Sequence, residues 1–204
     1  MQQRSRIDPS LISICARLSA DGHVFVREAA ALDEAQYRPW IDTDAYTGAW
    51  VVHPFVLAHA DGEQVYDVAG NCARCPASAA IFKSLPRVHI ASFSRLLPGT
   101  RLPPHRDYPK RNVLRIHIGL QGAEHAKLVI DNEVIQLQPG EVLVFDHSLE
   151  HESYHVGTQP RDIVLIDYEV DEVEAEHLGR LRGGVNLGPT ADSRVPWTSP
   201  KSLS

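Results

Sequence analysis

The sequence predicts a mainly β fold in which two antiparallel sheets close into a jelly roll. Six segments are rich in Val, Ile, Leu, Phe and Tyr, namely 49–58, 88–97, 112–120, 126–137, 141–146 and 161–170. Turn-forming residues separate them, as in Leu97-Pro98-Gly99-Thr100, Asp131-Asn132 and Gln138-Pro139-Gly140. Because these strands have no helices between them, antiparallel pairing is favoured over a parallel α/β sheet.

Two helices are expected beside the strands. Pro76 suits the first turn of a helix, apolar residues follow it at near-helical spacing, and Pro86 then stops the helix. A second helix begins at Asp171 and Glu172 and ends within 180–184, where basic residues precede two glycines. Acidic residues at its start and basic residues at its end suit the helix dipole.

The whole chain is expected to form a single catalytic domain, 1–204. Its 204 residues and 43% hydrophobic composition supply enough apolar surface for one core. We expect the jelly roll to occupy about 45–170. A tail over 185–204, with proline, serine and glycine, is expected either to be loose or to cover the barrel.

Charge and cysteine content limit the kinds of binding partner and the cellular compartment that we expect. The formal net charge is −6, and no lysine- or arginine-rich block favours nucleic acid or an anionic membrane as a partner. No apolar run approaches the roughly 20 residues that span a bilayer. The three cysteines fit a reducing compartment, and Cys72 and Cys75 have no second pair with which to form a zinc site. A cytoplasmic protein is therefore expected.

A candidate metal site begins in the stretch Pro104-His105-Arg106-Asp107-Tyr108. His105 and Asp107, two apart on an extended strand, project to the same side. His151 is expected at the end of an apolar strand and the start of a turn. Two imidazoles and one carboxylate form a facial triad that leaves positions open on non-heme Fe(II) for a chelating cosubstrate and for O₂. The alternative is a surface histidine beside a solvated aspartate.

Further candidates lie on two strands. Alternation puts Arg115 and His117 on one face of their strand, opposite the aliphatic residues at 114, 116, 118 and 120. Arg161 shares a face with Ile163 and Leu165. If that face is the barrel interior, the guanidinium needs an anion, such as the distal carboxylate of 2-oxoglutarate.

Two other readings concern neighbouring polar residues. Arg161 could instead form a buried ion pair with Asp162 or Asp167. His147 and His155, each four positions from His151, do not share its side as they would on a helix. We expect them to be outer partners of the site or to face solvent.

Several motifs in register resemble the aspartyl/asparaginyl β-hydroxylase family over roughly 70–170. They are Phe93-Ser94-Arg95-Leu96-Leu97-Pro98-Gly99-Thr100, Pro104-His105, Leu114-Arg115-Ile116-His117-Ile118-Gly119-Leu120, Gly140-Glu141, Phe145-Asp146, Glu150-His151-Glu152 and Arg161. The resemblance implies a cupin-like double-stranded β-helix with a few flanking helices and a 2-oxoglutarate-dependent hydroxylase activity.

The same resemblance implies the roles of individual residues. Fe(II) would be held by His105 and His151, and 2-oxoglutarate by Arg161 and Ser94, with His117 near its other end. Arg115 would then contact a substrate carboxylate.

At one position the chain departs from the animal members of this family. They have glycine where the third metal ligand would be, whereas Asp107 resembles the bacterial cis-proline hydroxylases. The expected substrate is therefore a free amino acid, a small derivative or an aminoacyl group on a carrier protein, hydroxylated at an unactivated C–H bond with release of succinate and CO₂. The alternatives are a cupin-type metal enzyme that does not use 2-oxoglutarate and a non-enzymatic sensor that binds a carboxylate.

Overall fold

A computed structural model of the chain describes residues 6–58, 65–107 and 112–181. The strands are β1 (Arg38–Pro39), β2 (Trp50–Leu57), β3 (Val88–Leu96), β4 (Arg101–His105), β5 (Val113–Gly119), β6 (Ala126–Ile130), β7 (Glu133–Ile135), β8 (Val142–Phe145), β9 (His151–His155) and β10 (Arg161–Glu169). The α-helices are α1 (Cys15–Ala20), α2 (Gly22–Ala30), α4 (Val68–Arg74), α5 (Pro76–Ser84) and α6 (Glu172–Leu181). Short 3₁₀ turns are η1 (Pro9–Leu11), η2 (Glu34–Gln36), η3 (Thr43–Ala45) and η4 (Ala123–His125).

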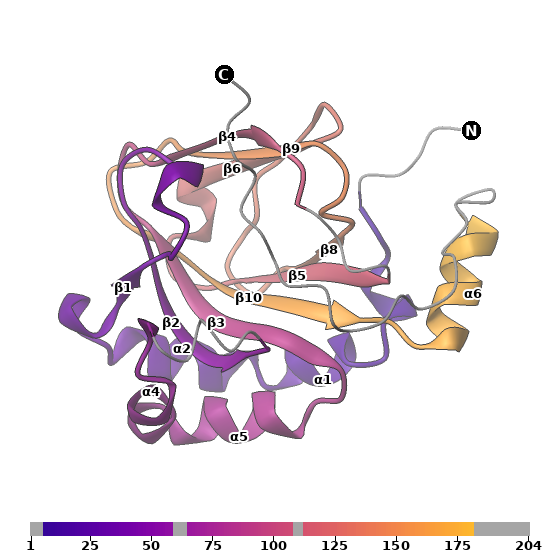
Figure 1. Cartoon of the computed structure of the whole chain (residues 1–204), viewed down its shortest axis with the longest axis horizontal. Coiled ribbons are helices and arrows are strands. Elements are labelled where there is room, and N and C mark those ends of the chain that lie inside the picture. The colour runs from indigo at the N-terminus through magenta and orange to yellow at the C-terminus, as the bar shows by residue number, and fades with distance from the viewer. Residues whose placement is uncertain (1–5, 59–64, 108–111, 182–204) are drawn as a thin grey trace.

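The strands form two antiparallel sheets, so the predicted jelly roll is confirmed. One sheet has six strands in the order β1-β2-β3-β10-β5-β8, and the other has four in the order β4-β9-β6-β7. The four-stranded sheet lies over one face of the larger sheet, while α1, α2 and α5 lie under the other (Figure 1). We call these the inner and the outer face of the six-stranded sheet.

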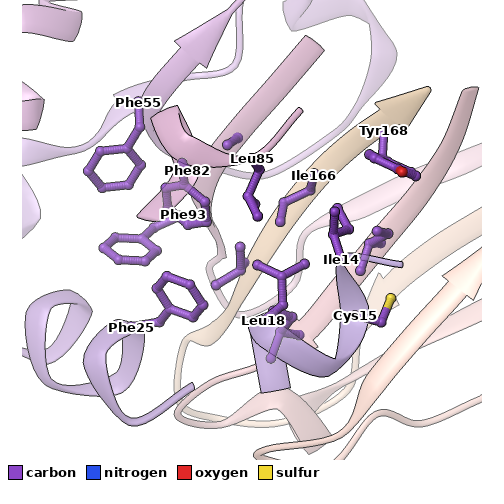
Figure 2. Packing of buried hydrophobic residues seen from close by; sticks show 14 of the residues in the cluster. Ile14, Cys15, Leu18, Phe25, Phe55, Phe82, Leu85, Phe93, Ile166 and Tyr168 are labelled. Atoms are coloured by element: carbon purple, nitrogen blue, oxygen red, sulfur yellow. The ribbon is translucent and has the colours of Figure 1, made fainter. Parts of the chain in front are cut away.

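The outer face carries the larger apolar core. Phe55 and Phe93 of the sheet pack against Phe25 of α2 and Phe82 of α5, and all four side chains are at most 1% exposed (Figure 2). The rings of Phe25 and Phe82 stack with centroids 4.9 Å apart. Helix α2 is one that the sequence reading did not predict. Its aromatic contact covers the outer face of the sheet, while the inner face carries a second apolar cluster together with buried polar groups.

Both predicted helices are present. Helix α5 begins at Pro76 and ends at Ser84, as proline placement indicated. Helix α6 begins after Asp171, whose carboxylate accepts from the Glu174 backbone N–H while Glu174 accepts from the Asp171 N–H. The predicted tail 185–204 lies outside the described residues. Within the described part of the chain, no helix is both long and apolar enough to cross a membrane.

Candidate metal centre

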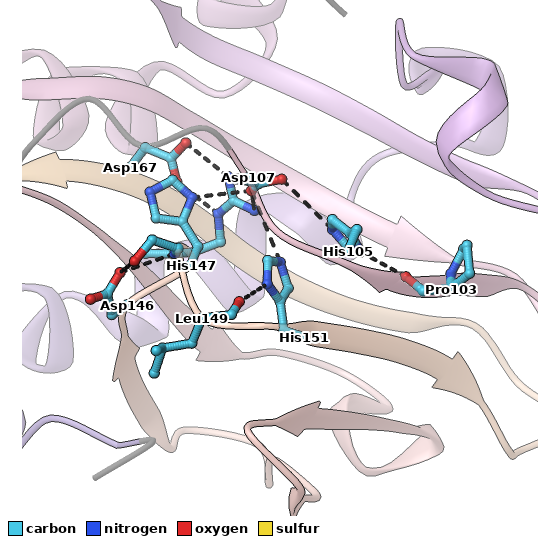
Figure 3. Close-up of polar contacts among 10 residues, drawn as sticks. Pro103, His105, Asp107, Asp146, His147, Leu149, His151 and Asp167 are labelled. Carbon is cyan, nitrogen blue, oxygen red and sulfur yellow. Dashed lines mark hydrogen bonds and ion pairs between the residues drawn. The ribbon is translucent and has the colours of Figure 1, made fainter. Parts of the chain in front are cut away.

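The three predicted metal ligands converge at the mouth of the space between the sheets. His105 is the last residue of β4 and His151 is the first of β9, and these two residues pair directly across the two strands. Asp107 follows just beyond β4, and one ligand atom from each residue lies within 4.8 Å of the others. Figure 3 shows all three side chains pointing toward one another.

Backbone carbonyls orient both imidazoles. The Nδ1 of His105 lies 2.7 Å from the Pro103 carbonyl oxygen, and the Nδ1 of His151 lies 2.9 Å from that of Leu149. A carbonyl can only accept, so Nδ1 is the donor in each ring, and in a neutral imidazole this tautomer leaves the lone pair on Nε2. The Nε2 atoms face Asp107, at 3.7 Å from Oδ1 for His105 and 4.0 Å from Oδ2 for His151. This tautomer is the one that binds a metal through Nε2.

The secondary structure around His151 differs from the prediction. We expected His151 at the end of an apolar strand before a turn, but that strand, β8, ends at Phe145, and His151 begins β9 after the turn. Asp107 likewise lies past the end of β4 rather than within a strand. Convergence therefore depends on the antiparallel pairing of β4 with β9, which sequence alternation alone does not reveal.

Burial and neighbouring charges keep the site in a metal-binding protonation state. Burial, followed by the charge of His105, lowers the pKa of His151 to about 4. Burial opposes ionisation of Asp107, but the guanidinium of Arg115 and a hydrogen bond from His147 hold its pKa well below the usual range. At neutral pH the set thus offers a neutral imidazole at His151 and a carboxylate at Asp107.

The predicted contacts of the cosubstrate lie on the inner face. Arg161 and His117 line one cavity together with apolar side chains from β6, β7, β8 and β10. Ser94 of β3 also lies on the inner face of the sheet, directly opposite Ile163 of the neighbouring strand β10. Its Oγ accepts a hydrogen bond from Trp50 at 2.9 Å, so its own O–H remains available to donate. The structure thus brings Arg161 and His117 together, with Ser94 on the neighbouring strand.

Arg161 has no ion-pair partner among the described residues. Its side chain is buried, and its hydrogen bond, to Ser153 Oγ, is long at 3.4 Å. The two acids considered as partners are engaged elsewhere, because Asp162 binds Arg95 at two points and Asp167 binds Arg115 at two points. Burial lowers the pKa of Arg161 to about 10, with partial compensation from Asp162. The alternative of a buried ion pair with Asp162 or Asp167 is therefore wrong.

His117 also carries an unsatisfied polar atom. Its Nε2 is buried and has no hydrogen-bond partner among residues 6–58, 65–107 and 112–181. Burial, followed by the charges of Arg161 and Arg115, lowers the pKa of His117 well below the usual value. Its ring meets Phe145 edge-on, and Phe145 meets His151 in the same way. His117 is therefore a neutral donor or acceptor between Arg161 and the metal ligands, facing the cavity rather than the outer core.

Arg115 has different partners from those expected of a substrate contact. Its Nε and Nη2 donate to Asp167 at 2.8 and 2.9 Å, and its Nη1 donates to Asp107 at 2.6 Å. The sequence did not define a role for His147, but its Nδ1 donates a hydrogen bond to the carboxylate oxygen Oδ2 of Asp107 at 3.1 Å. In the sequence, the only sign of this contact was that His147 lies four positions before His151.

Comparison with known proteins identifies the family. The model for the aspartyl/asparaginyl β-hydroxylase family matches residues 21–170, which is most of the chain. The chain belongs to this family. The match begins within the helices before the strands, so it extends further toward the N-terminus than the motifs predicted. Family membership supports hydroxylation as the reaction class.

Individual relatives match over shorter stretches. The chain is 38% identical over 101 residues to an ornithine lipid ester-linked acyl 2-hydroxylase of Rhizobium tropici, covering 48% of this chain and 36% of that protein. It is 31% identical over 139 residues to aspartate β-hydroxylase domain-containing protein 2 of the rat, covering 63% and 38%. The chain thus spans well under half the length of these relatives.

Among solved structures, a predicted oxalate decarboxylase of Thermotoga maritima matches 66% of this chain and 93% of its own, with 10% identity and a TM-score of 0.43.

Proposed function

We propose that the chain is an Fe(II)- and 2-oxoglutarate-dependent dioxygenase. It hydroxylates an unactivated C–H bond of an amino acid, a small derivative or a carrier-tethered aminoacyl group, and 2-oxoglutarate leaves as succinate and CO₂. The family supports hydroxylation. The choice of metal, cosubstrate and substrate class rests on the residues of this chain.

The observation that carries the proposal is the buried guanidinium of Arg161, which has no ion-pair partner within the described part of the chain. A buried cation is costly unless an anion accompanies it, and its planar fork fits a carboxylate in two-point contact. The guanidinium lies against Ser153, which is two residues along β9 from the metal ligand His151. Two residues of strand span roughly 6.6–6.8 Å. An extended five-carbon diacid has that reach, so 2-oxoglutarate could contact Arg161 while its other end reaches the metal.

The three-ligand set supports Fe(II) as the metal. His105, Asp107 and His151 provide two nitrogens and one oxygen on one side, which is the donor set of non-heme iron oxygenases. With 2-oxoglutarate and O₂, Fe(II) supplies an oxidant able to break an unactivated C–H bond. The residues of the chain hold the cosubstrate at Arg161, Ser94 and His117, and the apolar cavity wall keeps water from it.

An ester-linked acyl chain is a second candidate substrate. The observation in its favour is the 38% identity to the Rhizobium acyl 2-hydroxylase, the highest identity among the relatives described above. The residues that hold metal and 2-oxoglutarate would serve either substrate, because they do not select the acceptor.

Succinate formation tests the proposal. Purified protein, freed of metal and supplied with Fe(II), ascorbate and 2-oxoglutarate, is assayed against amino acids, their derivatives, aminoacyl carrier proteins and ester-linked acyl lipids. We expect succinate and a product heavier by one oxygen with one acceptor class, and loss of both in a strong chelator or in His105→Ala. Turnover of an acceptor without succinate would favour a cupin-type enzyme that does not use 2-oxoglutarate. Binding of a carboxylate without turnover of any acceptor would favour a sensor.

A further inference from the structure

The third metal ligand is held by a network of charged side chains behind it. Arg115 of β5 lies directly opposite Asp167 of β10 and binds it at two points. The remaining terminal nitrogen, Nη1, donates to Asp107 at 2.6 Å, and His147 Nδ1 lies 3.1 Å from the same carboxylate oxygen, Oδ2 (Figure 3). Both contacts therefore fall on one oxygen of Asp107.

Asp107 needs such support because the sheet does not fix it. It follows the end of β4 at His105, and its backbone N–H donates to the His147 carbonyl rather than to a strand partner. The backbone therefore sets where Asp107 lies but leaves the rotation of its carboxylate open. With Oδ2 held by Arg115 and His147, Oδ1 lies 3.7 Å from His105 Nε2, and Oδ2 itself lies 4.0 Å from His151 Nε2.

We propose that Arg115, held by Asp167, and His147 are positioning residues that fix the carboxylate of Asp107 for the metal. This inference rests on the proposed iron centre. It gives Arg115 a role other than contact with a substrate carboxylate, because three of its donors are engaged and two acids face its single positive charge. Such outer partners of metal ligands typically change metal affinity or activity 10–100-fold when removed.

The chain contains a matched control on the same strand. Asp162 of β10 lies directly opposite Arg95 of β3 and binds it at two points, both at 2.7 Å. Side-chain exposure is also alike, at 15% and 9% for Arg95 and Asp162 against 14% and 8% for Arg115 and Asp167. This second pair lies on the opposite face of β10 and contacts no metal ligand. Its variants report the structural cost of losing a paired arginine.

The experiment is a Co(II) titration followed by the visible absorption of the bound ion, with full-length metal-free protein. The variants are Asp167→Asn, Arg115→Lys and His147→Gln, with Asp162→Asn and Arg95→Lys as controls. Circular dichroism checks that each is folded. We expect Co(II) affinity to fall by about 10–100-fold in the first three, with an altered absorption spectrum, and to stay within a factor of about two in the controls.

The outcomes separate this inference from the function on which it rests. Wild-type protein that binds no Co(II) would overturn the iron centre, and the positioning role with it. Wild-type binding with unchanged affinity and spectrum in Asp167→Asn and Arg115→Lys would overturn the positioning role alone. If Arg115→Lys left Co(II) binding intact and raised only the KM for the acceptor, Arg115 would be a substrate contact instead.

Discussion

Arg161 is the residue at which stability and function conflict. It is buried in an apolar cavity wall, and the acids near it in sequence are bound to other arginines. Such a group is costly to bury, because the cation has lost water without gaining an anionic partner among the residues that the structure describes. In the proposed function, the carboxylate of 2-oxoglutarate offsets this cost when it binds.

Replacing Arg161 should therefore weaken 2-oxoglutarate binding and leave the metal site intact. For Arg161→Ala we expect a loss of about 2–5 kcal/mol in 2-oxoglutarate binding, because the distal carboxylate is left buried and unpaired. Arg161→Lys should recover only part of it, since an ammonium lacks the planar fork. Calorimetric titration of metal-loaded protein with 2-oxoglutarate measures the effect, and Co(II) titration of the metal-free variants checks the metal site.

Arg95→Ala is the matched control, because Arg95 is bound to Asp162 and does not line the cavity. Its 2-oxoglutarate affinity should equal that of wild type. Unchanged affinity in folded Arg161→Ala would remove Arg161 from the cosubstrate site.

The burial of Arg161 also predicts that an apolar side chain at this position stabilises the protein in the absence of 2-oxoglutarate. Arg161→Met keeps most of the volume and removes the cation, so the free energy of unfolding should rise by about 1–3 kcal/mol without 2-oxoglutarate. Urea unfolding measures it, and added 2-oxoglutarate should stabilise wild type but not the variant. A variant less stable than wild type in cosubstrate-free buffer would mean that the guanidinium has a stabilising partner.

At the scale of single residues, alternation along a strand correctly predicted which side chains share a face. The sequence did not predict which residues form ion pairs. The prediction that Arg115 and His117 share a face is confirmed. Leu114 and Ile116 point the other way, into the core between the sheet and the helices. The partner of Arg115, by contrast, is 52 positions away and becomes its neighbour only through the β5–β10 register. Pairing across distant strands cannot be read from local pattern.

Among the elements, the two strands that carry the histidine ligands were the hardest to predict. Strand β4 contains Pro103 and Pro104, and β9, His151–His155, contains no aliphatic residue. Apolar alternation is the main signal for a strand, and both lack it. In β4 the two prolines interrupt the pattern, although Leu102 is buried in the inner core. In β9 the buried residues His151 and Ser153 are polar, and they lie at the candidate metal centre and beside Arg161. The six apolar segments, in contrast, are all found as strands.

Helix α6 contacts the rest of the protein through a buried carboxylate, Glu174, and through Leu178 in the outer core. Glu174 is 5% exposed and accepts from the Ser13 N–H at 2.7 Å, the Tyr168 O–H at 2.9 Å and the Asp171 N–H at 2.9 Å. It therefore ties the helix to the N-terminal segment and to β10. A carboxylate with this many donors stabilises the fold more than a surface acid does.

Removing the carboxylate of Glu174 should destabilise the protein without changing the candidate metal centre. For Glu174→Ala we expect a loss of about 2–4 kcal/mol, because buried donors are left without an acceptor. Urea unfolding measures the loss, and Co(II) affinity should equal that of wild type. Glu172→Ala is the control, since Glu172 is exposed in the first turn of the same helix and should cost less than about 0.5 kcal/mol. Equal effects of the two substitutions would contradict the anchoring role.

At the scale of the whole molecule, the six-stranded sheet separates the larger apolar core from the face that carries the buried polar residues of the candidate site. Helices cover its outer face. Apolar residues between Ile7 and Leu32, which precede the predicted strands, also pack there. Its inner face carries Arg115, His117, Arg161 and Asp167 among apolar neighbours. Placing charged groups there is possible because the outer core provides the stability.

Burial of neutral imidazoles makes the metal-free protein sensitive to acid. The pKa of His151 is about 4 in the folded chain and about 6.5 when unfolded. Between these values the unfolded chain binds a proton that the folded chain does not, so stability falls as the pH falls. The difference corresponds to about 3 kcal/mol for this one residue, complete near pH 4. Asp107, whose pKa is depressed, adds stability that is lost only below about pH 4, so the two windows are separate.

Comparison with His151→Asn isolates this contribution, because the buried His53 and His117 also have lowered pKa values and titrate in both proteins. We expect the free energy of unfolding of metal-free wild type to fall about 3 kcal/mol more than that of His151→Asn between pH 6.5 and 4. Urea unfolding at half-unit pH steps measures it. Parallel curves for the two proteins would mean that His151 is protonated in the folded state, and that the imidazole is not held ready to bind a metal at mildly acidic pH.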